Sequence, residues 1–296
     1  MRNARIQWQG TKAVLKRGSL ILEAVRFEHT LFALPFAYIG MFLAADGLPT
    51  LSQFIWITVA MVGARTIAMS SNRLIHFKED ATNPRTANRH LPRGLLKPWE
   101  MGLLMLVSVG VFFFAASQLN TLALILAPVA AVYVVAYSYA KYYTWTTHFI
   151  LGWADAIAVA GAWVGVTGGL DPEAVVLSFA VAMWIGGFDI VYACQDVDFD
   201  AKYGVHSIPR RFGVEAAFWW YRGMHLCTTI ALLAVGIWMD LGYFYYIGWA
   251  IATALLAYEH TLVKPHDLSK LQLAFFTVNS YISAELLLFT SLAVVI

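Results

Sequence analysis

Long apolar runs, separated by short polar links, dominate the chain. Each run has about the 20 residues that an α-helix needs to cross about 30 Å of hydrocarbon. The pattern therefore predicts an all-α fold, an integral membrane bundle of nine transmembrane helices. We place the runs at residues 24–45, 51–72, 99–118, 121–140, 147–169, 174–195, 215–239, 243–262 and 272–295.

Composition points the same way. The sequence is 60% hydrophobic and 13% charged, whereas soluble domains are about 45–50% apolar and about 25% charged. No hydrophilic linker divides the runs, so we expect one membrane-embedded domain over residues 1–296. Residues 1–22 are basic and contain no compact apolar region. This favours a lead-in on the membrane surface, or a solvated tail, over a cleavable signal peptide.

The distribution of charge predicts the orientation of the bundle. With an odd number of spans and the N-terminus inside, all twenty Lys and Arg residues fall on the inner side or near it. This arrangement agrees with the positive-inside rule. The outer connections carry only acidic charges, at Asp46, Asp171, Glu173 and Asp240.

Two polar stretches follow the second and sixth apolar runs, both on the predicted inner face. In the first, Asn72, His76 and Asp80 are spaced i, i+4 and i+8, so on a continuing helix they point to one side. The second stretch has four residues that also share one helical face, namely Asp189, Tyr192, Asp196 and Asp200.

Carboxylates placed close together repel each other, so a face of this kind is usually held by a cation. Mg²⁺ prefers one or two carboxylates completed by phosphate oxygens. Two such faces with arginines nearby indicate a magnesium–diphosphate clamp. Asp189 lies inside its apolar run, and an ionisable group at membrane depth marks a functional site by default. The alternative for Asp189 is a hydrogen bond to a neighbouring helix.

Basic residues supply the other half of the predicted clamp, because arginine binds phosphate oxygens in a bidentate way. Contact with anionic lipid headgroups is the alternative for any one of them. Lys141, four residues after Tyr137, either grips a diphosphate or snorkels to the interface. Asp155 has no partner evident from the sequence, and we assign it no role. The candidates for phosphate contact are Arg73, Lys78, Arg85, Arg89, Arg93, Arg210 and Arg211.

Taken together, these motifs resemble the UbiA superfamily of intramembrane aromatic prenyltransferases. That superfamily has nine helices and two Asp-rich motifs, N-x-x-x-D-x-x-x-D and D-x-x-x-D. Within it, the chain is similar to the bacterial quinone-pathway branch. That branch prenylates 4-hydroxybenzoate, or in some members 1,4-dihydroxy-6-naphthoate. The segments that carry it are Phe27–Phe36, Gly63–Thr66, Asn72–Ile75, Asn83–Thr86, Tyr192–Asp196 and His206–Pro209.

The resemblance implies a role for individual residues. Asn72 and Asp80 match the first motif, Asp196 and Asp200 match the second, and Tyr137 with Lys141 matches a Y-x-x-x-K element near the diphosphate. His76 stands where the first motif normally has Asp. Imidazole is a poorer Mg²⁺ ligand than carboxylate, so this departure predicts a weakly held or water-bridged first metal, or a different divalent ion. A protonated His76 would instead touch the diphosphate.

The predicted site combines these arguments. Mg²⁺ is held by Asn72, His76, Asp80, Asp196 and Asp200, and the catalytic residues are Asp80, Lys141, Asp196 and Asp200. The predicted diphosphate-binding residues are Arg73, Arg85, Arg89, Tyr137, Lys141 and Arg210. The predicted substrate-binding residues are Asn72, Asp189, Tyr192 and Gln195.

We expect Mg²⁺-dependent transfer of a polyprenyl chain from polyprenyl diphosphate to a small aromatic acid, in ubiquinone or menaquinone biosynthesis. The ring proton leaves to a carboxylate or to the released diphosphate. The expected surroundings are the lipid bilayer of a bacterial cytoplasmic (inner) membrane, with the N-terminus and the active-site loops cytoplasmic. We expect no nucleic-acid partner and no obligatory protein partner.

Two other functions remain open. His76 favours a catalytically weak family member that binds prenyl diphosphate or quinone precursors. A small-solute transporter would explain the buried acids, but it does not explain two Asp motifs on the same inner face.

Overall fold

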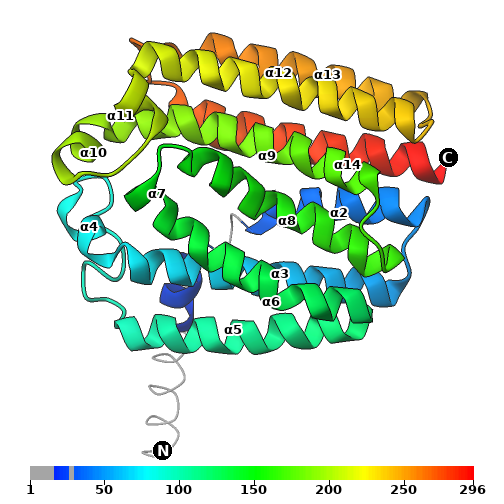
Figure 1. Cartoon of the computed structure of the whole chain (residues 1–296), viewed down its shortest axis with the longest axis horizontal. Helices are drawn as coiled ribbons and strands as arrows, with labels where there is room; N and C mark the ends of the chain where they lie inside the picture. The colour runs from blue at the N-terminus through cyan, green and yellow to red at the C-terminus, as the bar shows by residue number, and fades with distance from the viewer. Residues whose placement is uncertain (1–16, 27–29) are drawn as a thin grey trace, which may run out of the picture.

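The computed structural model describes residues 17–26 and 30–296 and shows a bundle of long helices (Figure 1). Within these residues the only β-type pairing is an isolated bridge between Lys264 and Asp267, so the predicted all-α class is confirmed. The long helices are α2 (Thr30–Ala45), α3 (Leu51–Ile75), α5 (Pro98–Leu119), α6 (Thr121–Ala136), α8 (Thr147–Thr167), α9 (Pro172–Ala193), α12 (Val214–Trp238), α13 (Tyr243–Leu262) and α14 (Asn279–Val295).

Six helical segments in the described part of the chain are long and apolar enough to cross a membrane. α2 contributes a shorter apolar helix, Leu34–Ala45, while α12 and α13 are long but do not belong to the six. A helix lies in each of the nine predicted runs, and the count of nine spans stays a prediction. The six segments are Leu51–Ile75, Pro98–Leu119, Thr121–Tyr143, Thr147–Thr167, Pro172–Tyr203 and Leu273–Val295.

The N-terminal part is described only from residue 17. Residues 17–24 form a short helix, and α2 begins at Thr30, later than the predicted start at residue 24. Most of the predicted basic lead-in (residues 1–16) and the beginning of the Phe27–Phe36 segment (residues 27–29) lie outside the described residues.

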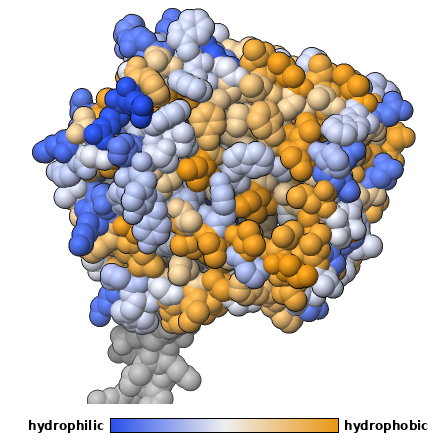
Figure 2. Space-filling model, in the orientation of Figure 1, coloured by the Kyte–Doolittle hydropathy of each residue, from blue (hydrophilic) through white to orange (hydrophobic). Residues whose placement is uncertain are grey.

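The surface of the bundle is apolar where lipid would surround it. Large apolar side chains face outward along α5, α6 and α12, among them Leu106, Val132 and Leu226. In Figure 2 the hydrophobic colour covers much of the middle of the visible face, while hydrophilic residues gather toward the two ends, most of them on the left. An exposed apolar belt of this extent marks a membrane surface.

α9 forms the centre of the bundle. It packs against α8 on one side and α12 on the other, and its side chains include the fully buried Trp184. Because α9 is surrounded by other helices, its C-terminal end has a fixed position relative to α3 and α8.

Several helices break at the polar end of the bundle, where α4, α10 and α11 lie (Figure 1). α3 stops at Ile75, and after His76 the chain continues as the short α4 (Phe77–Thr82). α9 passes through a 3₁₀ turn, η3 (Cys194–Asp196), into α10 (Val197–Tyr203), and α11 follows at Ile208–Phe212. The 3₁₀ turn η3 has three residues per turn, and His76 has a non-helical backbone conformation, so each break changes the direction of the residues that follow it. Neither Asp stretch lies on one uninterrupted helix, contrary to our expectation.

Close contact between α8 and α9 requires glycine. A Cβ atom added at Gly152 would lie 2.1 Å from the carbonyl oxygen of Ala182. That oxygen belongs to the backbone and cannot turn away, so any larger residue pushes the two helices apart.

We therefore expect Gly152→Ala to destabilise the protein by at least about 2 kcal/mol, since overpacking of a tight contact typically costs 1–3 kcal/mol. The measurement is thermal unfolding in detergent. Gly110→Ala on α5 is the matched control, because a Cβ there meets nothing within 4 Å. An equal unfolding temperature for the Gly152→Ala variant and wild type would contradict the close contact.

Candidate active site

A cavity of about 490 Å³ lies inside the bundle. Its walls come mainly from α3, α6, α8 and α9, and most of its lining residues are apolar. Charged groups in the lining come from Arg65, Asp155 and Asp189, and Tyr137 lies within electrostatic range of the first two. The cavity therefore offers a long apolar wall and one polar region.

The two polar stretches meet at the polar end of the bundle, and Asp189 of the second stretch lines the cavity. The Arg85 Nε donates to both carboxylate oxygens of Asp196, at 3.0 and 3.1 Å, across 111 residues of sequence. The Asn83 amide also donates to Asp196, at 3.2 Å. Arg85 Nη1 lies 3.3 Å from the Tyr192 hydroxyl, and the guanidinium sits 5.2 Å from the centre of that ring. Arg85 thus ties the loop after α4 to the end of α9.

Asp80 and Asp200 are both buried and both held by neighbours. Arg89 Nη1 donates to the two carboxylate oxygens of Asp80, at 2.6 and 2.7 Å. The Ser207 hydroxyl donates to Asp200 at 2.9 Å. These donors stabilise carboxylates that would otherwise be costly at this depth.

Lys141 lies between the two acidic stretches. Its ammonium group has no hydrogen-bond acceptor among the described residues, and it is within electrostatic range of Asp80, Glu79 and Asp200. The backbone holds it in place, because the His206 N–H donates to the Lys141 carbonyl at 2.7 Å. The ammonium lies over the Tyr142 ring, 5.7 Å from its centre, and its N–H donors are available to an anionic ligand.

His76 is buried and uncharged. Its Nδ1 lies 2.7 Å from the Tyr142 hydroxyl. Burial, together with the positive charges of Lys141 and Arg89, lowers the pKa of His76 to about 3. A neutral imidazole cannot act as the cationic diphosphate contact that a protonated His76 would have been.

Asp189 points into the cavity and is held from behind by His148. The distance from His148 Nδ1 to Asp189 Oδ2 is 2.7 Å. The backbone N–H of Ile208 points at His148 Nε2, 3.3 Å away. Because a backbone N–H can only donate, Nε2 is the acceptor and Nδ1 carries the proton. The deeply buried His148 therefore donates to Asp189 and orients it.

Two further predicted residues also lie at the polar end. The Asn72 amide donates to the Ser138 hydroxyl at 3.2 Å, and Tyr137 lines the cavity one residue away from Ser138. The last turn of α3 and the 3₁₀ turn η2 (Tyr137–Tyr139) are thereby joined.

Three predicted residues have donors bound to backbone carbonyls. Arg73 is buried, and its Nε donates to the Ala24 carbonyl at 3.1 Å. Gln195 is exposed and donates to the carbonyl of Tyr192, and Arg210 donates to that of Val205 at 2.6 Å. These contacts anchor loops and leave the remaining donors of the two arginines for other partners.

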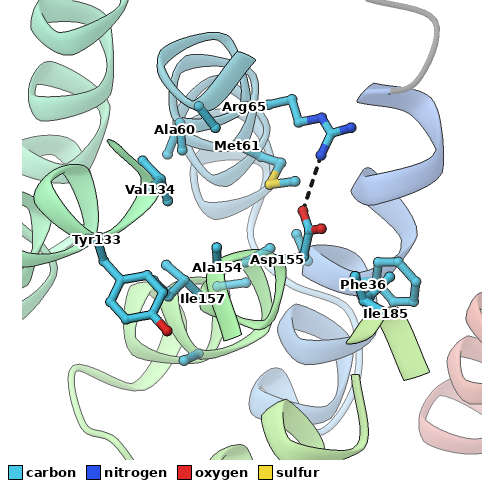
Figure 3. Close-up of a pocket in the computed structure, with 18 of the residues that line it drawn as sticks. Phe36, Ala60, Met61, Arg65, Tyr133, Val134, Ala154, Asp155, Ile157 and Ile185 are labelled. Atoms are coloured by element: carbon cyan, nitrogen blue, oxygen red, sulfur yellow. Dashed lines mark hydrogen bonds and ion pairs between the residues drawn. The ribbon is translucent and has the colours of Figure 1, made fainter. Parts of the chain in front are cut away.

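The sequence analysis missed two side chains of the cavity region, Arg65 and His148, and it found no partner for Asp155. Arg65 on α3 reaches across to Asp155 on α8, with 3.1 Å between Nη1 and Oδ1 (Figure 3). Asp155 therefore has a partner 90 residues away, and His148 holds Asp189. An ionisable group inside an apolar run was the signal that pointed to Asp189, and the same signal was present at Arg65 and His148.

The ligand atoms suit a magnesium ion whose coordination shell is completed by oxygens of a bound substrate. No three metal-binding side chains of the described residues converge on one point. The available ligands are carboxylate and amide oxygens, and Mg²⁺ usually takes only one or two protein carboxylates and completes its shell with water and phosphate oxygens. The residues therefore fit a site shared with a diphosphate, in which Arg85 and Arg89 exchange carboxylate oxygens for phosphate oxygens.

If Arg85 competes with a metal for Asp196, replacing Arg85 strengthens metal binding. We expect Arg85→Gln to show a larger Mg²⁺-induced rise in unfolding temperature than wild type, while losing about 1 kcal/mol of stability without metal. Arg93→Gln, at an exposed position of the same loop, is the control. An unchanged Mg²⁺ response would show that Asp196 is not a metal ligand.

Known proteins have related sequences and the same fold. The chain is 32% identical to the 4-hydroxybenzoate octaprenyltransferase of Aliivibrio fischeri (strain ATCC 700601 / ES114) over 297 residues, covering 100% of this chain and 99% of that protein. It is 30% identical to the enzyme of the same name from Vibrio cholerae serotype O1 (strain M66-2), with 88% of each covered.

Solved structures of related proteins have the same fold. A UbiA homologue from Aeropyrum pernix K1 superposes with a TM-score of 0.81 at 29% identity, covering 88% of this chain and 95% of that one. A UbiA homologue from Archaeoglobus fulgidus bound to GPP and Mg²⁺ has a TM-score of 0.73 at 18% identity, with 93% and 99% covered. The UbiA prenyltransferase family profile matches residues 33–281. With this match over most of its length, the chain belongs to the UbiA prenyltransferase family.

Proposed function

We propose that this protein transfers a polyprenyl chain from polyprenyl diphosphate to a small hydroxylated aromatic ring of the 4-hydroxybenzoate or 1,4-dihydroxy-6-naphthoate type. The observation that carries the proposal is the meeting of two acidic stretches, joined by Arg85, beside an apolar cavity. The names of its relatives and the GPP and Mg²⁺ bound to a protein of the same fold support it.

The diphosphate end of the substrate belongs at the polar end of the bundle. One or two of the carboxylates of Asp80, Asp196 and Asp200 would hold Mg²⁺ together with the diphosphate, and Asn72 is a further candidate ligand. The metal neutralises the diphosphate when bound. Lys141 lies within electrostatic range of acids from both stretches, and no described residue accepts a hydrogen bond from its ammonium. Arg85 and Arg89 turn toward phosphate oxygens. These cations stabilise the negative charge that develops as the diphosphate leaves.

The apolar cavity suits the prenyl chain and the reaction. Its walls exclude water, which would otherwise capture the allylic cation that forms at the first carbon of the chain. An electron-rich ring attacks this carbon and then loses a proton. Asp189 faces the cavity and is one acceptor for that proton; the released diphosphate is the other.

The protein works, on this proposal, as one membrane-embedded unit of nine spans over residues 1–296. The distribution of Lys and Arg supports a cytoplasmic N-terminus and a diphosphate site on the cytoplasmic side of a bacterial inner membrane. The site then receives water-soluble acceptors and Mg²⁺ from the cytoplasm and prenyl diphosphates from the bilayer.

Loss of either acidic group in the second stretch should stop the reaction. We expect Asp196→Asn and Asp200→Asn to lower turnover at least about 100-fold, because each removes charge that holds the metal against the developing negative charge. Turnover is measured as prenyl transfer in liposomes. Asp198→Asn is the matched control, since Asp198 is exposed between the two positions. Full activity in either folded variant would rule out the proposed site.

His76 gives a second candidate function, a binder with weak catalysis, because a neutral imidazole replaces a carboxylate at the first metal. Geranyl diphosphate is offered with 4-hydroxybenzoate or 1,4-dihydroxy-6-naphthoate, in Mg²⁺, Mn²⁺ or EDTA. We expect metal-dependent product from wild type and faster turnover from His76→Asp, which restores a carboxylate ligand for a hard cation. Product from His76→Asp alone would favour the binder.

A further inference from the structure

A cluster of aromatic rings lies at the polar end of the bundle, where α11 meets the first turns of α8 and α12. Trp145, just before α8, packs edge-on against Phe212 of α11, with 5.2 Å between the ring centroids. Trp220 of α12 lies 6.1 Å from Trp145 and 6.3 Å from Phe212. Phe212 and Trp220 are exposed, and the described lining of the cavity contains none of the three residues. These three rings, which we call the aromatic patch, therefore form an outer surface separate from the cavity.

Arg211 lies over the aromatic patch. Its guanidinium carbon is 5.5 Å from the centre of the Trp145 ring and 5.4 Å from the centre of the Phe212 ring. Arg211 is exposed, and its side chain forms no hydrogen bond or ion pair with any described residue. Its neighbour Arg210 differs, because it donates to the Val205 carbonyl. Arg211 is thus held by rings alone and keeps all five of its N–H donors for another partner.

The aromatic patch adds two further donors. The indole N–H groups of Trp145 and Trp220 have no acceptor in the described part of the chain. Three other tryptophans donate their indole N–H to protein oxygens, namely Trp163, Trp184 and Trp249. Arg211 and the two indoles therefore make a positively charged surface of donors that lacks an acceptor. An anion that accepts several hydrogen bonds complements this surface.

The position of the patch selects the kind of anion. Tryptophan gathers at the level of the lipid headgroups, where one part of the ring is in apolar surroundings and the N–H meets polar groups. Farther along α12 the surface is apolar, with Leu226 and Ile230 exposed. A phospholipid can place its phosphate at Arg211 and its acyl chains along this surface. Because no described acid balances the charge of Arg211, a lipid with a net negative charge fits better than a zwitterionic one.

We propose that Arg211 and the aromatic patch form a binding site for the headgroup of an anionic phospholipid. The guanidinium binds phosphate oxygens in a bidentate way, and the rings hold it in place through cation–π contacts. The indole N–H groups then donate to the remaining oxygens of the headgroup. A site of this kind reads the planar shape of arginine as well as its charge, which separates it from the general attraction between basic residues and a membrane surface.

The test measures lipid binding to the full-length protein in detergent by native mass spectrometry. Dissociation constants are compared for phosphatidylglycerol, which is anionic, and for phosphatidylcholine with the same acyl chains, which is zwitterionic. Arg211→Gln removes the charge, Arg211→Lys keeps the charge but not the planar group, and Phe212→Leu removes one ring. Lys270→Gln removes an exposed positive charge from the segment after α13 and is the matched control. Thermal unfolding shows that each variant is folded.

We expect wild type to bind phosphatidylglycerol at least about fivefold more tightly than phosphatidylcholine. Arg211→Gln should lose this preference, because one basic residue beside an anionic lipid contributes about that factor. Arg211→Lys and Phe212→Leu should each weaken phosphatidylglycerol binding at least about twofold, through the loss of a cation–π contact. Lys270→Gln should leave it unchanged. If one of the Arg211 or Phe212 variants does not fold, the other two answer the question.

Equal affinity of wild type for the two lipids overturns the proposal, as does unchanged phosphatidylglycerol binding in Arg211→Gln. Arg211→Lys binding like wild type, or Lys270→Gln binding as weakly as Arg211→Gln, would show a diffuse attraction of charges and no built site. The KM for geranyl diphosphate is measured in phosphatidylcholine liposomes as well. A raised KM in Arg211→Gln, with phosphatidylglycerol binding unchanged, would assign Arg211 to the diphosphate and refute the lipid site.

Discussion

Charge pairing between distant parts of the chain is the constraint on which the rest of the structure depends. A carboxylate at the edge of a bilayer is costly unless a donor or a cation meets it. Asp80 is met by Arg89, Asp196 by Arg85, and Asp189 by His148. The last two pairs join segments far apart in sequence, so they hold helix ends together as well as satisfying charge.

This pairing also prepares the site for a ligand. Arginines that neutralise carboxylates in the ligand-free protein are the groups that can turn toward a diphosphate when a metal takes their place. Lys141 differs from them, because it lies among the acids without a hydrogen-bond acceptor in the described part of the chain. The polar end therefore combines cations that exchange partners with one that is already available.

Helix breaks give the polar end its shape. Had α3 and α9 continued as straight helices, the acids of each stretch would lie along one line. The turns at His76 and at η3 instead rotate Asp80 and Asp200 relative to the residues before them. Both carboxylates become buried, and loop residues such as Asn83 and Ser207 reach the acids from the side.

The sequence by itself determined the class of fold and the family. Lipid imposes a simple rule, that spanning segments be apolar and about 20 residues long, and such runs can be read directly. The two acidic stretches could be predicted to form a functional site, because a charged group inside or beside an apolar run is costly unless it has a partner or a ligand. The same rule applied to Arg65 and His148, whose partners it could not name.

Only the tertiary structure decided which groups meet. Arg73 and Arg85 are equally plausible phosphate contacts in the sequence, yet one donates to the Ala24 carbonyl and the other to Asp196. Asp155 had no evident partner in the sequence. Its partner is Arg65, 90 residues away, which the packing of α3 against α8 brings within hydrogen-bond distance. Local spacing specifies which residues share a helix face, but partners between helices depend on how the helices pack and rotate. That information is spread over the whole chain.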